Sequence, residues 1–317
     1  MERILITGIG GQVGSYLAEL LSADGHEVVG LTSSPKRLLP MGVERARGSL
    51  EPEGIQELVR GNGALTAIVH LASVTAMTQS WEEPVRTFDV NGRAGVALAF
   101  AAAETPRLRL VHASSAEIFG RARTPTQNES TPVDPVSPYG VAKAAAHFAV
   151  RFVRQTFGAA ASNLILYMTE SPRRRPNFVL RKITRSVAAM LCGDADHIIL
   201  GNTQAVRDFS HARDVASAAR LLALGANAGD YVCASGQGRT IQAVAETACR
   251  IAGLDPTGRV RTDPTLLRTN DIPSLVGDSR SLRALGWEPR TTFDELLREL
   301  FDYDLSEYRA QRRAQSA

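Results

Sequence analysis

Short apolar runs alternate with longer amphipathic stretches through the first half of the chain. Runs of strand length lie at residues 3–6, 27–31, 67–72, 108–113 and 163–167. Between them, stretches such as 85–104 and 141–157 have the apolar spacing that is typical of helices. Strands that alternate with helices in this way predict a parallel, doubly wound α/β sheet.

Glycines follow the first apolar run directly, and a periodic helix begins soon after them. Glycines at this spacing let the backbone turn tightly and approach a pyrophosphate, whose charge a helix N-terminus stabilises. A plain glycine turn is the alternative, but the position between a strand and a helix favours the first βα unit of a Rossmann-type dinucleotide-binding domain. The residues expected to contact the dinucleotide here are Gly8, Gly11, Gln12, Val13 and Gly14.

The composition is that of a protein with a large core: 317 residues, 44% hydrophobic and 22% charged. A net charge of +3 gives no overall basic field, so neither nucleic acid nor a membrane is expected as a partner. No apolar run approaches the roughly 18 residues of a membrane span. The three cysteines are dispersed and no metal-ligand pattern is present, which indicates no metal site and a reducing compartment, the cytoplasm.

The composition changes at the start of the second half of the chain, where prolines and arginines become frequent after the fifth apolar run. This change predicts a Rossmann domain over residues 1–167, with a return segment around 205–235. A smaller C-terminal domain over 168–317 is expected to bind mainly the substrate. We expect Trp287 to pack in this smaller domain and the polar, basic tail from residue 306 to fray.

The candidate chemistry centres on Tyr139, which Lys143 follows four residues later in a predicted helix, with Ser114, Ser115 and Glu117 upstream. Four residues make about one helical turn, so the phenol and the ammonium lie on one helix face. A tyrosine titrates near pH 10. To act as a base near neutral pH, its pKa must fall by about three units, which Lys143 and a cationic nicotinamide would supply. Together with the dinucleotide site, the pair predicts hydride chemistry.

Motifs along nearly the whole chain resemble the extended short-chain dehydrogenase/reductase family that acts on nucleotide sugars, and most closely the GDP-mannose 4,6-dehydratases. The matching stretches are residues 6–21, 115–120, 127–129, 137–143, 170–174, 177–179, 181–183, 200–202, 207–214 and 286–289. The resemblance implies an NADP-dependent 4,6-dehydratase that acts on GDP-mannose or a related GDP-sugar. The reaction would pass through a 4-keto sugar and eliminate water across C5–C6.

The resemblance also implies roles for four candidate catalytic residues. Tyr139, with Lys143 beside it, would remove the proton of the sugar C4 hydroxyl, and Ser115 would hydrogen-bond the C4 oxygen. Glu117 would take the C5 proton and return it to the departing C6 oxygen, although a structural role at a strand end is the alternative. Two other hypotheses remain: an epimerase or keto-sugar reductase of the same fold, and a catalytically inactive NADP-binding protein.

The cofactor type is indicated at the end of the second apolar run, where NAD-binding domains carry an acidic residue and this chain has none. Hydroxyls and cations stand there instead. They suit the 2′-phosphate of NADP, with NAD as the alternative, and the residues are Thr32, Ser33, Lys36 and Arg37. By the resemblance, further cofactor contacts are expected at Leu71, Ala72, Tyr139 and Lys143.

For the substrate, the resemblance implies that Arg207 and Arg268 hold the pyrophosphate and that Lys182 lies near the nucleoside. Planar guanidinium groups suit phosphate oxygens. Arg175 stands where the family has glycine, so we expect this residue at the surface. Other substrate contacts are expected at Met168, Asn177 and Val179.

Departures from the family pattern indicate altered contacts. Met168 and Thr169 replace the Asn-His of the family beside the sugar phosphate, and residues 74–78 differ from the usual sugar-facing loop. The segment 35–47 lacks most of a longer loop that helps to build tetramers in the family. A homodimer is therefore favoured, with a tetramer as the alternative.

Overall fold

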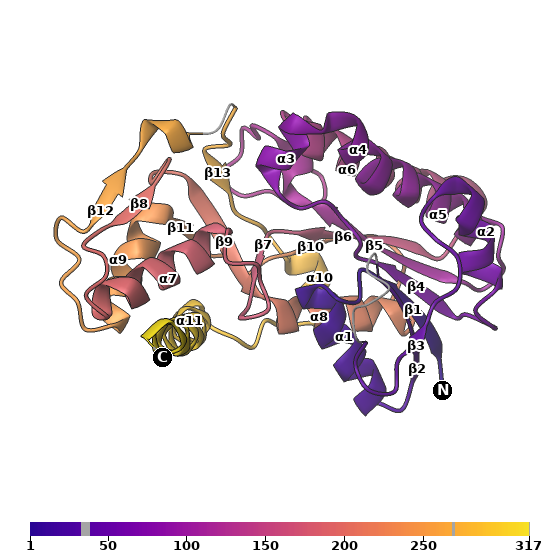
Figure 1. Ribbon diagram of the computed structural model, residues 1–317. Helices are drawn as coiled ribbons and strands as arrows, with labels where there is room; N and C mark the ends of the chain where they lie inside the picture. The colour runs from indigo at the N-terminus through magenta and orange to yellow at the C-terminus, as the bar shows by residue number, and fades with distance from the viewer. Residues whose placement is uncertain (33–38, 268–269, 317) are drawn as a thin grey trace.

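The computed structural model describes residues 1–32, 39–267 and 270–316, and a parallel sheet runs through its larger half (Figure 1). In the described part of the chain this sheet has seven strands, in the order β10-β6-β5-β4-β1-β2-β3. Every neighbouring pair is parallel. The strands are β1 (Arg3–Thr7), β2 (Glu27–Leu31), β3 (Glu44–Arg45), β4 (Ala67–His70), β5 (Arg109–Ser115), β6 (Ala161–Leu166) and β10 (Asp230–Cys233).

Helices cover both faces of this sheet because successive strand residues point to opposite sides. Ile4 and Ile6 of β1 share one apolar cluster with α1 and α8, whereas Leu5 shares another with α2, α5 and α6. These helices are α1 (Gln12–Ala23), α8 (Ala212–Ala223), α2 (Pro52–Arg60), α5 (Ala94–Ala103) and α6 (Pro138–Phe157). The predicted doubly wound α/β fold is confirmed.

The strand order reverses between β1 and β4, which are neighbours in the sheet although β2 and β3 lie between them in sequence. The crevice outside the carboxyl ends of strands at such a switch point is where doubly wound sheets bind their ligands. The glycine turn after β1 and the residues after β4 and β5 therefore meet at this edge of the sheet.

The helix predicted over 85–104 is divided into three elements, α4 (Pro84–Phe88), a π-helical turn η1 (Asp89–Arg93) and α5, and α3 (Met77–Glu82) precedes them. Gly92 allows η1 to approach α6 closely, because a Cβ atom at this position would lie 3.1 Å from the carbonyl oxygen of Ala142. The spacing of apolar residues does not distinguish a single π turn from an α-helix, so the pattern did not reveal it.

The smaller half of the molecule has its own apolar core between short strands and three helices (Figure 1). β9 (Val206–His211) pairs with β7 (Met168–Glu170), β11 (Gly238–Thr240) and β13 (Ser274–Leu275), and β8 (Ile198–Leu200) pairs with β12 (Val260–Thr262). The helices are α7 (Val179–Leu191), α9 (Ile241–Ile251) and α11 (Phe293–Ser316), with short turns η2 (Ala116–Phe119), η3 (Pro264–Leu266) and α10 (Arg280–Arg283) elsewhere.

The expectation that Trp287 packs in the smaller domain is wrong. Its side chain lies in the apolar cluster of α1 and α8, on the face of the seven-stranded sheet. The indole N–H donates to the carbonyl of Asp214, 2.9 Å away, and to Ser217 Oγ, 3.0 Å away, both on α8. The chain returns to the larger half through α10, a crossing that local sequence patterns do not show.

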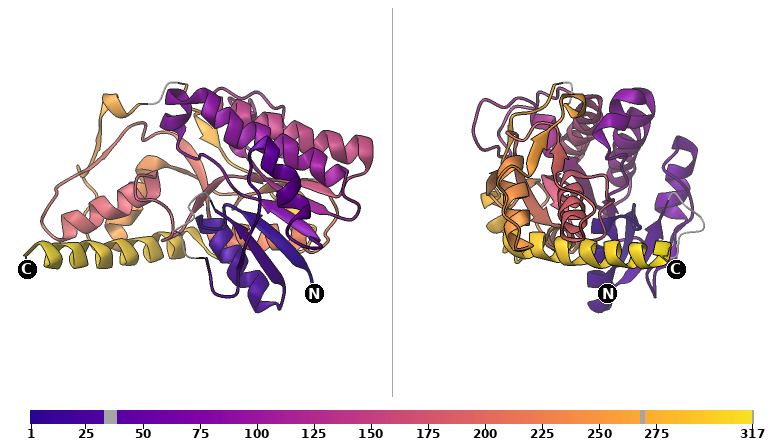
Figure 2. Two further views of the ribbon diagram at one scale, coloured as in Figure 1. Left: turned by 45° about the vertical axis from the view of Figure 1, so that its right-hand side comes forward. Right: turned by 60° about the vertical axis from the view of Figure 1, so that its left-hand side comes forward.

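The expected fraying of the tail from residue 306 is also wrong, because α11 continues through Ser316 (Figure 2). Polar contacts hold its second half to the end of α7: Arg312 donates to the carbonyl of Cys192 over 2.8 Å, and the Tyr308 hydroxyl donates to Asp194 over 3.1 Å. Neither α11 nor any other helix in the described residues is long and apolar enough to cross a membrane.

Candidate active site

Helix α6 begins immediately before Tyr139, and its start is encoded locally. Ser137 is the N-cap residue, and its Oγ accepts a hydrogen bond from the N–H of Gly140 over 3.0 Å. Pro138 occupies the first turn, where its missing N–H costs nothing. Gly158, with φ of 67°, ends the helix in the left-handed conformation. These signals fix Tyr139 in the first turn of α6.

The turn η2 brings Ser115 and Glu117 to the same place. Ser115 ends β5 and caps η2, since its Oγ accepts from the N–H of Glu117 over 3.3 Å. Gly140 permits the close approach of η2 to α6, because a Cβ atom there would lie 2.8 Å from the carbonyl oxygen of Glu117. Both residues act on the Tyr139 phenol, because the Ser115 hydroxyl lowers its pKa and the charge of Glu117 raises it. Three of the four predicted catalytic residues are thus together.

The environment of Tyr139 holds its phenol in the neutral form. Desolvation is the largest effect and raises the pKa of Tyr139 above its ordinary value, and the negative charge of Glu117 raises it further. The hydroxyls of Ser115 and Ser73 and the positive charge of Arg174 lower this pKa, but they do not prevail. The downward shift that a base at neutral pH requires is therefore not supplied by these residues alone.

Lys143 is buried one turn further along α6, and its ammonium donates to the carbonyl oxygen of Ala113 on β5 over 2.8 Å. Burial lowers the pKa of Lys143 to about 8. Tyr139 and Lys143 lie in successive turns of one helix, as their spacing predicted. The hydrogen bond of the lysine nevertheless goes to the strand backbone and not to the phenol.

Two histidines lie side by side on the neighbouring strands β4 and β5, and the charge of Lys143 acts on both. The rings of His70 and His112 stack with their centroids 5.4 Å apart, and both are buried. Burial and, after it, the charge of Lys143 lower the pKa of His70 to about 3 and that of His112 well below its ordinary value. Both rings are therefore neutral at physiological pH. Thr7 hydrogen-bonds His70 Nδ1 over 2.8 Å, which ties β1 to β4.

The glycine turn has the backbone geometry of a phosphate cradle. Gly8 has φ of 71°, and a Cβ atom there would lie 2.8 Å from the N atom of Ala72. A Cβ atom at Gly14 would lie 2.6 Å from the carbonyl oxygen of Gly8, so both positions require glycine. No described side chain caps the N-terminus of α1, and its first turn contains no acidic residue. The turn therefore fits a dinucleotide pyrophosphate, which the N–H groups of the first turn of α1 would bind.

The side chain of Gln12 joins this turn to β7 and to the residue that follows it. Its Nε2 donates to the carbonyl of Thr169 over 2.7 Å, and its Oε1 accepts from Ser171 Oγ over 2.8 Å. Leu71 and Ala72 follow β4 and flank the turn, since the N–H of Ala72 donates to Thr7 Oγ1. Thr32 follows β2, whereas Ser33, Lys36 and Arg37 lie outside the described residues.

The predicted substrate residues occupy different places in the smaller half. Arg207 of β9 is buried and donates to Asp271 over 3.0 Å, and Asn202 donates to the other oxygen of Asp271 over 2.8 Å. Met168 of β7 is partly buried against the core of the smaller half. Val179 and Lys182 lie in the first turn of α7, Asn177 is exposed before it, and Arg268 is outside the described residues.

Residue patterns did not reveal several side chains near Tyr139. Ser73 and Arg174 both act on its phenol. Arg174 stacks on the ring of Phe178, 3.4 Å from its centroid, and its Nε lies 3.9 Å from the carboxylate of Glu170. Burial raises the pKa of Glu170 to about 7. Arg174 lies in the family-like stretch 170–174, but residue patterns assigned it no role, because it also stands in a run of arginines and such runs are more often solvated. Arg175, by contrast, is exposed as expected.

The family model described as GDP-mannose 4,6 dehydratase matches residues 5–300 of the chain. The chain belongs to this family. GDP-mannose 4,6-dehydratase sdnI of Sordaria araneosa is 32% identical over 333 residues, which cover 96% of this chain and 61% of that protein. GDP-mannose 4,6 dehydratase 2 of Arabidopsis thaliana is 33% identical over 322 residues, covering 95% and 86%. The chain therefore spans about three fifths of the fungal relative and most of the plant relative.

Solved structures of nucleotide-cofactor enzymes share the fold of this chain. The UDP-glucose 4-epimerase of Thermus thermophilus in complex with NAD is 29% identical, with a TM-score of 0.82 over 95% of this chain and 98% of that one. RMD from Pseudomonas aeruginosa in complex with NADPH is 26% identical, with a TM-score of 0.80 over 97% and 100%. The resemblance that the motifs indicated is confirmed.

Proposed function

We propose that this member of the GDP-mannose 4,6-dehydratase family is an NADP-dependent nucleotide-sugar 4,6-dehydratase acting on GDP-mannose or a related GDP-sugar. The observation that carries the proposal is the convergence of Ser115, Glu117 and Tyr139 at the carboxyl edge of the sheet. A hydroxyl, a carboxylate and a phenol in one place are the groups that oxidation at C4 and elimination across C5–C6 need. The phosphate cradle at α1 lies at the same edge.

In this mechanism, the glycine turn before α1 would hold NADP, which would supply a hydride acceptor for C4 and, once reduced, a hydride donor for C6. Tyr139 takes the proton of the C4 hydroxyl, and Ser115 orients the C4 oxygen by a hydrogen bond. Lys143, fixed by the Ala113 carbonyl, contributes positive charge that favours the phenolate. The ketone formed at C4 makes the C5 proton acidic, and Glu117 moves this proton to the departing C6 oxygen.

We infer that the chain is divided into a cofactor-binding part and a substrate-binding part with the bounds that the sequence predicted. Residues 1–167, with a return segment around 205–235, would bind the cofactor, and 168–317 mainly the substrate. The pairing of β10 with β6 supports the return segment. Arg207, Arg268 and Lys182 would bind the nucleotide, and Met168, Asn177 and Val179 would complete the substrate contacts.

All three cysteines are free thiols, which supports the cytoplasm as the compartment.

NADP is the cofactor we favour over NAD. No acidic residue follows β2, and Thr32 with the cationic residues beyond it would receive a 2′-phosphate. Titration calorimetry with NADP and NAD measures this preference. Tighter binding of NADP is expected, and equal or tighter binding of NAD would contradict it.

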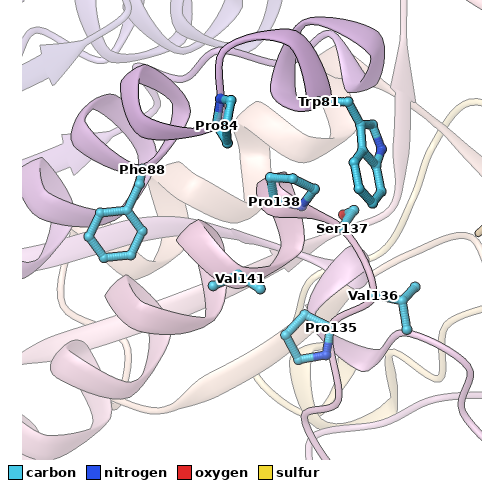
Figure 3. Close-up of a pocket in the computed structure, with 8 residues that line it drawn as sticks. All are labelled: Trp81, Pro84, Phe88, Pro135, Val136, Ser137, Pro138 and Val141. Atoms are coloured by element: carbon cyan, nitrogen blue, oxygen red, sulfur yellow. The ribbon is translucent and has the colours of Figure 1, made fainter. Parts of the chain in front are cut away.

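We also propose a homodimer, for which an exposed apolar face supplies the support. Val141, Phe148 and Phe152 lie along one side of α6 and are each about half exposed. The ring of Phe152 packs edge-on against Phe157, and both contact Phe100 of α5. At the start of α6 this face continues into an open apolar hollow of about 480 Å³ between α3, α4 and α6, with Trp81 at one end (Figure 3). Contiguous exposed apolar patches often mark sites of protein–protein interaction.

The proposed reaction is tested by mass spectrometry after incubation of the protein with NADP and a panel of GDP-, UDP-, dTDP- and CDP-sugars. A product lighter by one water from a GDP-sugar is the expected result and identifies the substrate. An isobaric product would point instead to an epimerase. Retained cofactor with no product from any sugar would favour a binding protein without catalysis.

A further inference from the structure

A buried glutamine joins the glycine turn to the part of the chain that leads into the smaller half. Gln12 is the first residue of α1 and is only 9% exposed. Its Nε2 donates to the carbonyl of Thr169 and its Oε1 accepts from Ser171 Oγ, residues that follow 157 and 159 positions later. Because a buried amide or hydroxyl without a partner is costly, these bonds hold residues 169–174, which we call the linking segment, to the start of α1.

The contact between α1 and the linking segment continues along one face of the helix. Arg173 donates to Ser15 Oγ over 2.9 Å and pairs with Glu19 over 2.8 Å, and its guanidinium lies 3.7 Å from the centroid of the Tyr16 ring. Gln12, Tyr16 and Glu19 are spaced at i, i+4 and i+7, so they share this face. The ion pair is partly exposed and contributes little, which leaves the buried bonds of Gln12 as the main attachment.

The other side of the linking segment is held by α7. Arg181 is buried and donates to the carbonyl oxygens of Pro172 over 2.7 Å and Arg174 over 2.6 Å. The same guanidinium pairs over 2.6 Å with Asp304 of α11, which is also buried. Arg181 is therefore fixed at both ends, and it precedes Lys182, which is expected near the nucleoside. The linking segment thus connects the dinucleotide turn to the helix that carries predicted substrate contacts.

The start of the linking segment belongs to a sheet that carries further predicted substrate contacts. Thr169 pairs with Ser210 of β9, and Arg207 lies on the same strand. Met168 immediately precedes Thr169 on β7. The carbonyl that Gln12 binds is therefore part of the strand pairing that positions Met168 beside β9.

We propose that Gln12 and Ser171 are positioning residues that couple the two binding sites, so that a dinucleotide bound at the glycine turn fixes the linking segment and preorganises the nucleotide-sugar site. The inference rests on the proposed function for the identity of the two ligands. A first ligand that orders the linking segment leaves less ordering for the second ligand to bring about. Each ligand should therefore bind more tightly when the other is present, and by the same factor.

The first experiment is hydrogen exchange of the full chain followed by mass spectrometry, with and without saturating NADP or NAD and with no sugar present. The dinucleotide is expected to slow amide exchange in the glycine turn and also in the linking segment of the wild type. In Gln12→Met the protection of the turn should persist, because backbone N–H groups bind the pyrophosphate, and the protection of the linking segment should be lost. Unchanged exchange of the linking segment in the wild type would overturn the inference, whatever sugar the protein acts on.

The second experiment measures the coupling itself by titration calorimetry of GDP, with and without NADP. In the wild type NADP is expected to tighten GDP binding about tenfold, the usual scale of coupling between sites. In Ser171→Ala this factor should fall to about twofold, the loss expected for one hydrogen bond, and in Gln12→Met it should disappear. The affinity of Ser171→Ala for GDP alone should stay close to that of the wild type, because Ser171 lies at the coupling contact and not among the predicted substrate residues.

Ser162→Ala is the matched control, since it also removes a buried serine hydroxyl, one that accepts from the N–H of Gly229. It should keep the wild-type coupling factor. Equal coupling in the wild type, Ser171→Ala and Gln12→Met would overturn the inference, and weaker binding of GDP alone with an unchanged factor would mean a merely structural role. A wild type that does not bind GDP would contradict the proposed substrate instead, and the nucleotide of the sugar that the panel identifies would then take the place of GDP in the same comparison.

Discussion

Tyr139 and Lys143 show how much the site depends on what it binds. Desolvation keeps the phenol neutral, and the lysine ammonium is buried with a carbonyl oxygen as its partner. Both groups have an environment that disfavours the charged form which hydride chemistry would use. The molecule therefore holds a site whose electrostatics are completed only when a dinucleotide and a substrate arrive.

The buried lysine predicts a pH-dependent cost to stability. The folded pKa of about 8 lies below the ordinary 10.5, so at neutral pH burial of the charge costs about 3 kcal/mol. Between pH 8 and 10.5 the unfolded chain holds a proton that the folded chain has lost, so this cost fades as pH rises. Lys143→Met should therefore stabilise the ligand-free protein at pH 7, by about 3 kcal/mol less the lost hydrogen bond, with little difference near pH 10.

Urea unfolding of the wild type and Lys143→Met across this pH range measures the difference. The same variant should lose at least a hundredfold in turnover, because its charge is part of the proposed site. A difference in stability that does not change with pH would show that the lysine is not titrating as described.

Glu117 separates the proposed dehydratase from an epimerase of the same fold. In Glu117→Gln we expect the dehydrated product to fall by about 10²- to 10⁴-fold, since a group that moves a proton in the transition state contributes on this scale. Reduction of the bound cofactor by substrate should persist. Absorbance of the reduced nicotinamide and mass spectrometry of the sugar measure the two steps, with Glu53→Gln on the surface of α2 as the control. Unchanged dehydration would assign Glu117 a structural role.

At the scale of elements, α6 is where local sequence and function coincide. The Ser137 cap lies two residues before Tyr139, so loss of the cap loosens the turn that carries the phenol. Ser137→Ala should cost about 1 kcal/mol in the free energy of unfolding and lower turnover as well. Denaturant unfolding and kcat are the measurements. Ser137→Thr, which keeps a capping oxygen, should restore both, and equal loss in the two variants would show that the cap is not responsible.

The elements with strong local signals were predictable, and the rest depended on contacts between distant segments. The strand before Gly8 and the helix around Tyr139 are encoded by apolar spacing, glycine and a cap. The bridge made by Gln12 was not predictable, because nothing near the glycine turn shows that its side chain will bond to the distant strand β7. Trp287 was misplaced for a similar reason: its partner Asp214 lies on a helix that only the three-dimensional path of the chain brings near.

At the scale of the whole molecule, the exposed aromatic face on α5 and α6 predicts association. Phe152 lies at the centre of this face and is 47% exposed, so Phe152→Asp would place a charge in the proposed interface. We expect the wild type to have the mass of a dimer by light scattering coupled to gel filtration, and Phe152→Asp the mass of a monomer. Ile199→Asp, which changes a similarly exposed apolar residue on β8, is the control. A monomeric wild type would refute the dimer.

The pairing of β10 with β6 has a consequence for how a cell makes this protein. The sheet is completed only after β7, α7, β8, β9 and α8 have been synthesised, and Trp287, which packs against α8, leaves the ribosome later still. Until then β6 presents an open strand edge, which is a template for aggregation. We therefore expect translation that stops before β10 to yield insoluble fragments.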